Sequence, residues 1–179
     1  MTKLNFIGFH ATSKESANKI INDRFIINKK RNNDWLGHGI YLFEHEVDAE
    51  SWAKGTYYCR NNPAIIKCCI EVEKDKFLNL DDPQKMNVYI EYFQEALELL
   101  SENNISLEFK DEKQAMCWGL NLYKEDKLMD VIKYTFPNTR TKNVMKYNYD
   151  NMSYNYNEVQ ICVTSNKSIM NKELWCKEG

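Results

Sequence analysis

"DWLGHGIYLFEHEVDAESWA", residues 34–53, combines a Gly-His-Gly turn, a short apolar run and a segment with helical spacing. The turn uses two of the chain's six glycines, placed on either side of His38. Glycine permits a positive φ or a close approach of another group to the backbone. We therefore expect a tight turn that leads into the strand "GIYLF", with something lying against Gly37 and Gly39.

Three elements are predicted upstream of this segment. "NFIGFH" (residues 5–10) alternates apolar residues and predicts a short strand that ends at His10. Thr12, with Glu15 three positions later, forms a capping-box pattern, so a helix is expected to begin there. "FIIN" (residues 25–28) predicts a short buried strand before a polar loop.

Downstream, Asp48 is a candidate cap for a helix that carries Trp52. "PAIIKCCIEVE" (residues 63–73) is the strongest strand pattern in the chain. Because adjacent residues on a strand point to opposite faces, the thiols of Cys68 and Cys69 are expected to lie apart.

The middle of the chain predicts helices and the tail predicts strands. Residues 83–101 space their apolar side chains as a helix opened by proline, and a second helix is predicted over 113–134. Residues 143–150 and 155–163 then alternate as an antiparallel strand pair. The chain therefore predicts one α+β domain with a helical insert at about residues 83–135.

Composition limits the class of protein. The chain has 24 basic and 26 acidic residues, and its net charge of −2 predicts no general affinity for nucleic acid. No apolar run approaches the ~18 residues of a membrane span, and the N-terminal apolar segment is too short for a signal peptide. We expect a cytoplasmic protein with no membrane partner. The six cysteines show neither a Cys-x-x-Cys pair nor a histidine at zinc-finger spacing, which predicts free thiols and no metal site.

Three chemically capable residues lie at predicted strand ends. His10 follows the first strand, Tyr41 lies in "GHGIYLF", and Glu158 lies in "YNEVQICV". Each alone has a simple structural explanation, as a surface histidine, a core tyrosine and a solvated glutamate. Together and in this order they resemble the His-Tyr-Glu signature of the ADP-ribosyltransferase superfamily, in its diphtheria-toxin and poly(ADP-ribose)-polymerase-like branch.

The resemblance covers nearly the whole chain. The family's His-Gly-Ser/Thr, Gly-x-Gly-Ile-Tyr-Phe and strand-borne Glu motifs are matched by His10-Ala11-Thr12, residues 37–42 and Asn157-Glu158. Ala11 replaces the usual glycine and Leu42 the usual phenylalanine, while Trp52 matches a second aromatic that follows one short helix later. The resemblance implies a split antiparallel β-sheet core with the helical insert.

The resemblance also implies that NAD is a substrate that is consumed. A carboxylate on Glu158 would stabilise positive charge that develops on the ribose when the nicotinamide bond breaks. Tyr41 and Trp52 would hold the nicotinamide ring between them, His10 would bind a ribose hydroxyl, and Thr12 the carboxamide. The residues assigned to NAD are His10, Ala11, Thr12, Gly39, Tyr41, Trp52 and Gln160. Gln160 belongs to this set because a register shifted by two residues would put it in the place of Glu158.

The segment before Glu158 bears on which molecule accepts the ADP-ribose. In the arginine-modifying branch the residue two before the catalytic glutamate is Glu or Gln, and here it is Tyr156, which disfavours arginine. Residues 133–157 carry four basic residues and one acid, interleaved with tyrosines. Basic and aromatic side chains suit phosphates and unpaired bases, so RNA or single-stranded DNA is the favoured acceptor. The candidate acceptor residues are Arg140, Lys142, Lys146, Tyr154 and Tyr156.

Two alternatives stay open: a protein acceptor, and an inactive module that binds NAD or ADP-ribose. A solvated loop with tyrosine-rich strand faces equally explains the basic segment. The small size favours transfer of one ADP-ribose unit. By analogy with bacterial toxins and anti-phage effectors, the sequence predicts such a role, with an antitoxin or chaperone as a further partner.

Overall fold

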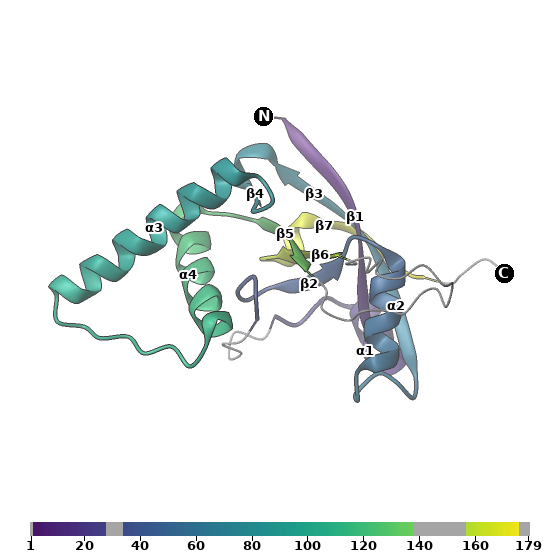
Figure 1. The fold of residues 1–179 in the computed structure, drawn as a ribbon. Helices are drawn as coiled ribbons and strands as arrows, with labels where there is room; N and C mark the ends of the chain where they lie inside the picture. The colour runs from purple at the N-terminus through teal and green to yellow at the C-terminus, as the bar shows by residue number, and fades with distance from the viewer. Residues whose placement is uncertain (1, 28–33, 138–156, 176–179) are drawn as a thin grey trace, which may run out of the picture.

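The computed structural model describes residues 2–27, 34–137 and 157–175. Its core is a seven-stranded mixed sheet in the order β4-β5-β6-β2-β1-β3-β7. The strands are β1 (Lys3–Ser13), β2 (Ile40–Phe43), β3 (Pro63–Glu73), β4 (Phe77–Asn79), β5 (Val131–Pro137), β6 (Asn157–Val163) and β7 (Ile169–Leu174). The α+β class is confirmed (Figure 1).

The described residues also form four α-helices. They are α1 (Lys14–Asn22), α2 (Glu46–Gly55), α3 (Pro83–Glu102) and α4 (Glu112–Lys127), and two short 3-10 turns occupy Lys74–Lys76 and Asn166–Ser168. The predicted strand 63–73 and the proline-opened helix are confirmed as β3 and α3. Cys68 is buried and Cys69 exposed, as expected for neighbours on a strand.

The predicted helix caps are wrong by a few residues. The cap of α1 is Ser13 rather than Thr12, because β1 pairs with β3 as far as Ser13. The cap of α2 is His45, and Asp48 lies in the first turn of that helix. Residues 25–27 of the predicted "FIIN" strand are not a strand; the side chain of Asn166 instead binds the Phe25 N–H and C=O, both at 3.0 Å.

The second predicted helix ends early. Leu128 adopts φ 54° and closes α4, and the following residues form β5, which pairs antiparallel with β6. β4 and β5 are parallel, so the sheet is mixed and not wholly antiparallel as predicted. This parallel pair follows from the insert, because α3 and α4 form the crossover between its two strands. The predicted strand 143–150 lies outside the described residues.

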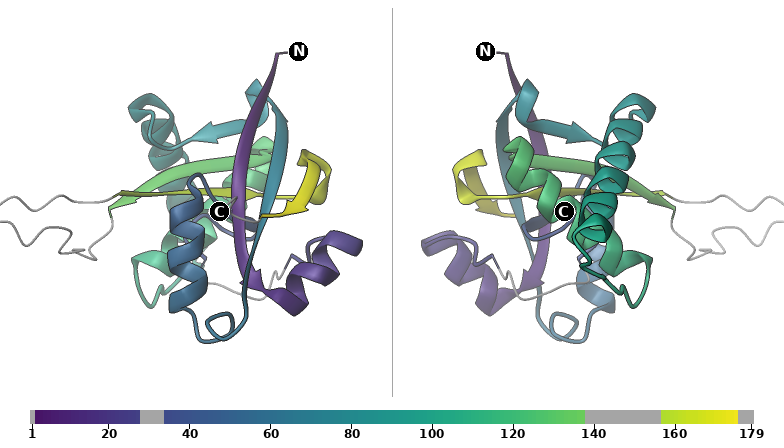
Figure 2. Two further views of the ribbon diagram at one scale, coloured as in Figure 1. Left: turned by 90° about the vertical axis from the view of Figure 1, so that its right-hand side faces the viewer. Right: turned by 90° about the vertical axis from the view of Figure 1, so that its left-hand side faces the viewer.

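The sheet opens between β1 and β2. Eleven residue pairs join β1 to β3, whereas a single pair, Phe9 with Phe43, joins β1 to β2. Beyond this pair, β1 stays paired with β3, and β2 stays paired with β6. Figure 2 shows β1 and β3 running across the direction of β5 and β6. The sheet is therefore split into two parts, with its narrowest junction at the strands that carry His10 and Tyr41.

Candidate active site at the opening between β1 and β2

The Gly37–Gly39 turn is shaped by close packing. Gly37 has φ +74°, which side-chain-bearing residues rarely adopt. A Cβ at Gly39 would lie 2.8 Å from the Val163 carbonyl oxygen and would collide with the Cys162 sulfur. What lies against this backbone is therefore β6 of the same chain.

Two side chains of α4 hold the turn from the other side. Asn121 Oδ1 accepts a hydrogen bond from the His38 N–H at 2.7 Å, and Lys124 Nζ donates one to the His38 carbonyl at 2.6 Å. Lys124 is 6% exposed, and burial lowers the pKa of its ammonium. No sequence motif marked Asn121 or Lys124, because their contacts with His38 span more than eighty residues.

Tyr41 closes the turn through its hydroxyl. The hydroxyl accepts a hydrogen bond from the Leu36 N–H at 2.7 Å and donates one to the Gly37 carbonyl at 2.9 Å. Its ring packs against the cluster under α3 and α4. Burial raises the pKa of the phenol well above its usual range, so the hydroxyl stays protonated. In this structure Tyr41 ties the strand β2 to its preceding turn.

His10 bridges the opening of the sheet. Its Nδ1 lies 2.8 Å from the Tyr41 carbonyl oxygen, and since a carbonyl only accepts, Nδ1 carries the proton. The ring edge meets the Phe25 ring at a centroid distance of 4.9 Å. Burial lowers the pKa of His10, and the hydrogen bond to Tyr41 offsets this only in part. His10 is therefore a neutral imidazole whose Nε2 is the hydrogen-bond acceptor.

The third motif lies on the neighbouring strand. Cys162 pairs with Tyr41, and Gln160 with Phe43, so Glu158 lies two same-face positions further along β6 than the partner of Tyr41. That separation is ~13 Å of strand. Gln160 Nε2 donates a hydrogen bond to Glu158 Oε1 at 2.5 Å, which makes the two candidate residues one hydrogen-bonded unit.

α2 adds the second aromatic candidate. Trp52 is 40% exposed, and its ring centroid lies 6.5 Å from that of Phe43. Ala11 and Phe43 are buried in the cluster beneath α2, while Thr12 is half-buried. Phe43, rather than Tyr41, is thus the direct ring neighbour of Trp52.

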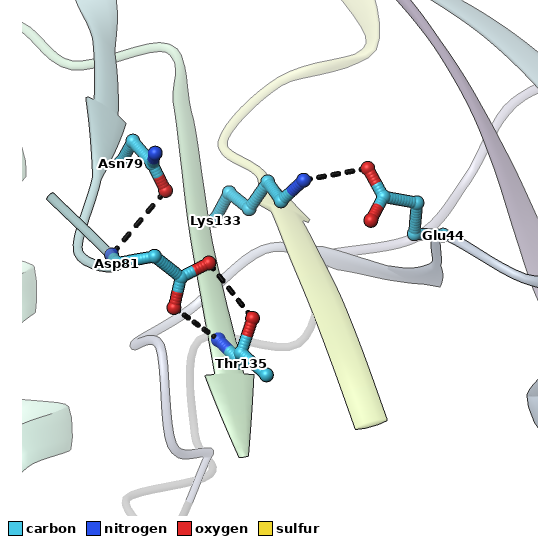
Figure 3. Close-up of polar contacts among 5 residues, drawn as sticks. All are labelled: Glu44, Asn79, Asp81, Lys133 and Thr135. Carbon is cyan, nitrogen blue, oxygen red and sulfur yellow. Dashed lines mark hydrogen bonds and ion pairs between the residues drawn. The ribbon is translucent and has the colours of Figure 1, made fainter. Parts of the chain in front are cut away.

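A separate cluster of polar side chains links β5 to the residues that follow β2 and β4 (Figure 3). Lys133 Nζ on β5 pairs with Glu44 Oε1 at 2.5 Å. Asp81 accepts hydrogen bonds from the Thr135 N–H and hydroxyl, both at 2.8 Å, and its own N–H donates to Asn79 Oδ1 at 3.3 Å. Lys133 is the first basic residue of the predicted acceptor segment 133–157. Its ammonium is instead paired with Glu44, which joins β5 to the end of β2.

The acceptor candidates Arg140, Lys142, Lys146, Tyr154 and Tyr156 lie outside the described residues. Within the described ranges, no group of three or more His, Cys, Asp or Glu side chains is placed to hold a metal ion. The same ranges contain no helix with the length and apolar character needed to span a bilayer.

Comparisons with known proteins add one relative. No family model and no solved structure matches the chain. The chain is 36% identical over 76 residues to an uncharacterized protein, MJ0359, of Methanocaldococcus jannaschii; these residues are 40% of this chain and 36% of the archaeal protein. The match thus spans about a third of that relative's length.

Proposed function

We propose that the protein is an NAD-dependent mono-ADP-ribosyltransferase. The observation that carries the proposal is that three motifs distant in the sequence lie on three adjacent strands, β6, β2 and β1. The hydrogen bond from His10 Nδ1 to the Tyr41 carbonyl joins the first two motifs across the opening of the sheet. The aromatic and hydrogen-bonding side chains that these strands carry are of the kind that bind a flat ring on a ribose.

His10 and Glu158 have complementary roles in this proposal. The neutral imidazole offers Nε2 as an acceptor for a ribose hydroxyl, because Nδ1 is occupied by the Tyr41 carbonyl. When the bond from ribose C1 to nicotinamide breaks, nicotinamide leaves with the bonding electrons. The carboxylate of Glu158 stabilises the positive charge left on the ribose. An acceptor nucleophile then bonds to C1 and releases its proton.

Gln160 positions the carboxylate. Its amide donates to Glu158 Oε1 at 2.5 Å, which restricts the rotamers of Glu158 and leaves Oε2 available for a substrate hydroxyl. The same geometry allows Gln160 itself to face the ribose if the register of the third motif is shifted. Separate substitution of the two residues distinguishes these arrangements.

The experiment is transfer of label from NAD to cell extract. Glu158→Gln should lower transfer about 10²–10³-fold, because one charge-stabilising group is lost from the transition state. Glu173→Gln on β7 is the matched control: it removes a strand-borne glutamate whose side chain is 57% exposed, and transfer should be unchanged. Loss of transfer in Gln160→Ala with activity kept in Glu158→Gln would move the role to Gln160.

Equal transfer by the wild type, Glu158→Gln and Gln160→Ala, or transfer by none of them, would overturn the enzyme proposal. NAD binding without transfer would favour the inactive binding module instead. Nuclease and protease digestion of the labelled fraction separates a nucleic-acid acceptor from a protein acceptor. For a nucleic-acid acceptor, charge reversal at Arg140, Lys142 and Lys146 should lower transfer to oligonucleotides; unchanged transfer would remove these residues from the acceptor site.

A further inference from the structure

The helical insert carries an apolar cavity that opens to solvent. It has a volume of about 370 Å³ and lies between α3 and α4, where Tyr92, Leu99 and Leu100 face Trp118 and Leu122. Leu99 is 59% exposed, and Ile105, a lining residue just after the end of α3, is 50% exposed. All the lining residues belong to α3, α4 and the segment that joins them. Figure 1 shows the C-terminal end of α3 extending away from the sheet.

Carboxylates flank the cavity along α3. Glu91, Glu95, Glu98 and Glu102 repeat at three- and four-residue spacing and so form a stripe beside the lining residues. All four are exposed, and no ion pair involves them among the described residues. Residues 86–109 contain five glutamates and no lysine or arginine, although the whole chain is nearly neutral.

We propose that this groove between α3 and α4 docks a basic amphipathic helix of a partner protein. A helix with apolar residues at i, i+3/i+4 and i+7 would place them over Leu99 and Trp118, and its Lys or Arg side chains would meet the glutamate stripe. A second copy of α3 is disfavoured because two such stripes repel. An anionic lipid surface is disfavoured for the same reason.

The groove is one helix away from the candidate active site. Trp118 and Leu122 of α4 line the groove, and Asn121 and Lys124 of the same helix hold the His38 backbone. A partner that shifts α4 therefore changes the support of the Gly37–Gly39 turn. This regulatory consequence rests on the proposed function, whereas the docking itself does not.

The test is binding of a labelled 18-residue peptide with leucines at helical spacing flanked by lysines, measured by fluorescence anisotropy without NAD. Leu99→Asp should weaken binding at least tenfold, and the double variant Glu95→Lys, Glu98→Lys should weaken it and reduce its salt dependence. Ile26→Asp, at a residue 92% exposed outside the insert, adds the same charge and should leave binding unchanged. Circular dichroism melts check that each variant is folded.

Two control peptides show whether binding depends on the helical spacing of the leucines and on the positive charge of the lysines. A peptide of the same composition with its leucines scrambled should bind at least tenfold more weakly, and one with lysines replaced by glutamates should not bind. Equal affinity for the scrambled peptide, equal binding by Leu99→Asp, or no binding of the lysine peptide would each overturn the proposal. Because no arm uses NAD, failure here leaves the transferase test unaffected.

Discussion

At the scale of single residues, His10 shows how burial and one hydrogen bond set a protonation state. The Tyr41 carbonyl holds the proton on Nδ1, and burial disfavours a second proton on the ring. A neutral imidazole is what an acceptor for a ribose hydroxyl requires. The same group therefore couples the stability of the fold to pH.

Stability should fall as the pH drops below about 6.5, the ordinary pKa of histidine. In the unfolded chain His10 binds a proton near that pH, whereas in the folded protein its pKa is lowered, so the unfolded state binds more protons. The contribution of His10 is complete above pH ~6.5 and is lost as the pH falls toward the folded pKa. Urea unfolding of the wild type and His10→Asn at pH 7.5 and pH 5.0 measures it.

Asparagine keeps a donor for the Tyr41 carbonyl but does not titrate, so His10→Asn should lose less free energy of unfolding between the two pH values. All carboxylates are common to both proteins and cancel in the comparison. An equal loss in both proteins would mean that His10 is as easily protonated in the folded state as in the unfolded state.

Gly39→Ala should lower the free energy of unfolding by about 1–3 kcal/mol, because the new methyl group meets the Val163 backbone and the Cys162 sulfur. Gly55→Ala is the control, since a Cβ there has no neighbour within 4 Å. Gly55 ends α2, and alanine there should be neutral or slightly stabilising. Thermal melts in which the two variants behave alike would contradict the tight approach of β6 to this turn.

At the scale of elements, α4 acts as a brace for the turn before β2. Asn121→Ala should destabilise the protein by about 1–3 kcal/mol, because the His38 N–H loses its acceptor. The specific signature is faster hydrogen exchange of the His38 amide, with exchange in β3 unchanged. Asn171→Ala on the edge strand β7 is the matched control: it removes only an exposed hydrogen bond from the neighbouring Lys172 N–H, and exchange at His38 should be unchanged. Unchanged exchange at His38 would show that Asn121 does not hold the turn.

Elements with a strong local pattern were predicted from the sequence. β3 and α3 were found with nearly their observed bounds, because alternation and helical spacing are local signals. β5 was predicted as helix because the apolar spacing before Ile132 fits both structures, and Leu128 ends α4 without a glycine or proline to mark it. β7 was not predicted, since its residues are mostly exposed and show little alternation.

The residues of the candidate site also divide into those that local sequence can indicate and those that only long-range contacts define. His10, Tyr41 and Glu158 could be singled out as candidates because each belongs to a short motif in, or at the end of, a predicted strand. Asn121 and Lys124 could not be found, because only the packing of α4 on the turn gives them a partner. Local sequence thus indicated the candidate chemistry, while the groups that hold the turn depend on long-range contacts.

At the scale of the whole molecule, one sheet carries packing on both faces. α1 packs on the cluster that contains Ile66 and Leu42. The insert covers a second cluster, which contains Leu78, Leu120 and Ile132, on the opposite face. Neighbouring residues of the same strands serve both clusters, so loss of either face removes support from the other. The insert should therefore be part of the cooperative folding unit rather than an appendage.

Leu120→Ala tests this cooperativity. Leu120 is fully buried under α3, so its truncation should cost about 2–5 kcal/mol, and each kcal/mol should lower the Tm by about 2–4 °C at this chain length. Tryptophan fluorescence reports partly on Trp118 in α4, whereas far-ultraviolet circular dichroism reports on the sheet and helices together. The two transitions should coincide in the wild type and shift together in Leu120→Ala. A fluorescence transition that separates from the circular dichroism transition would show that α3 and α4 unfold independently, and docking at their groove could not then be coupled through α4 to the turn at His38.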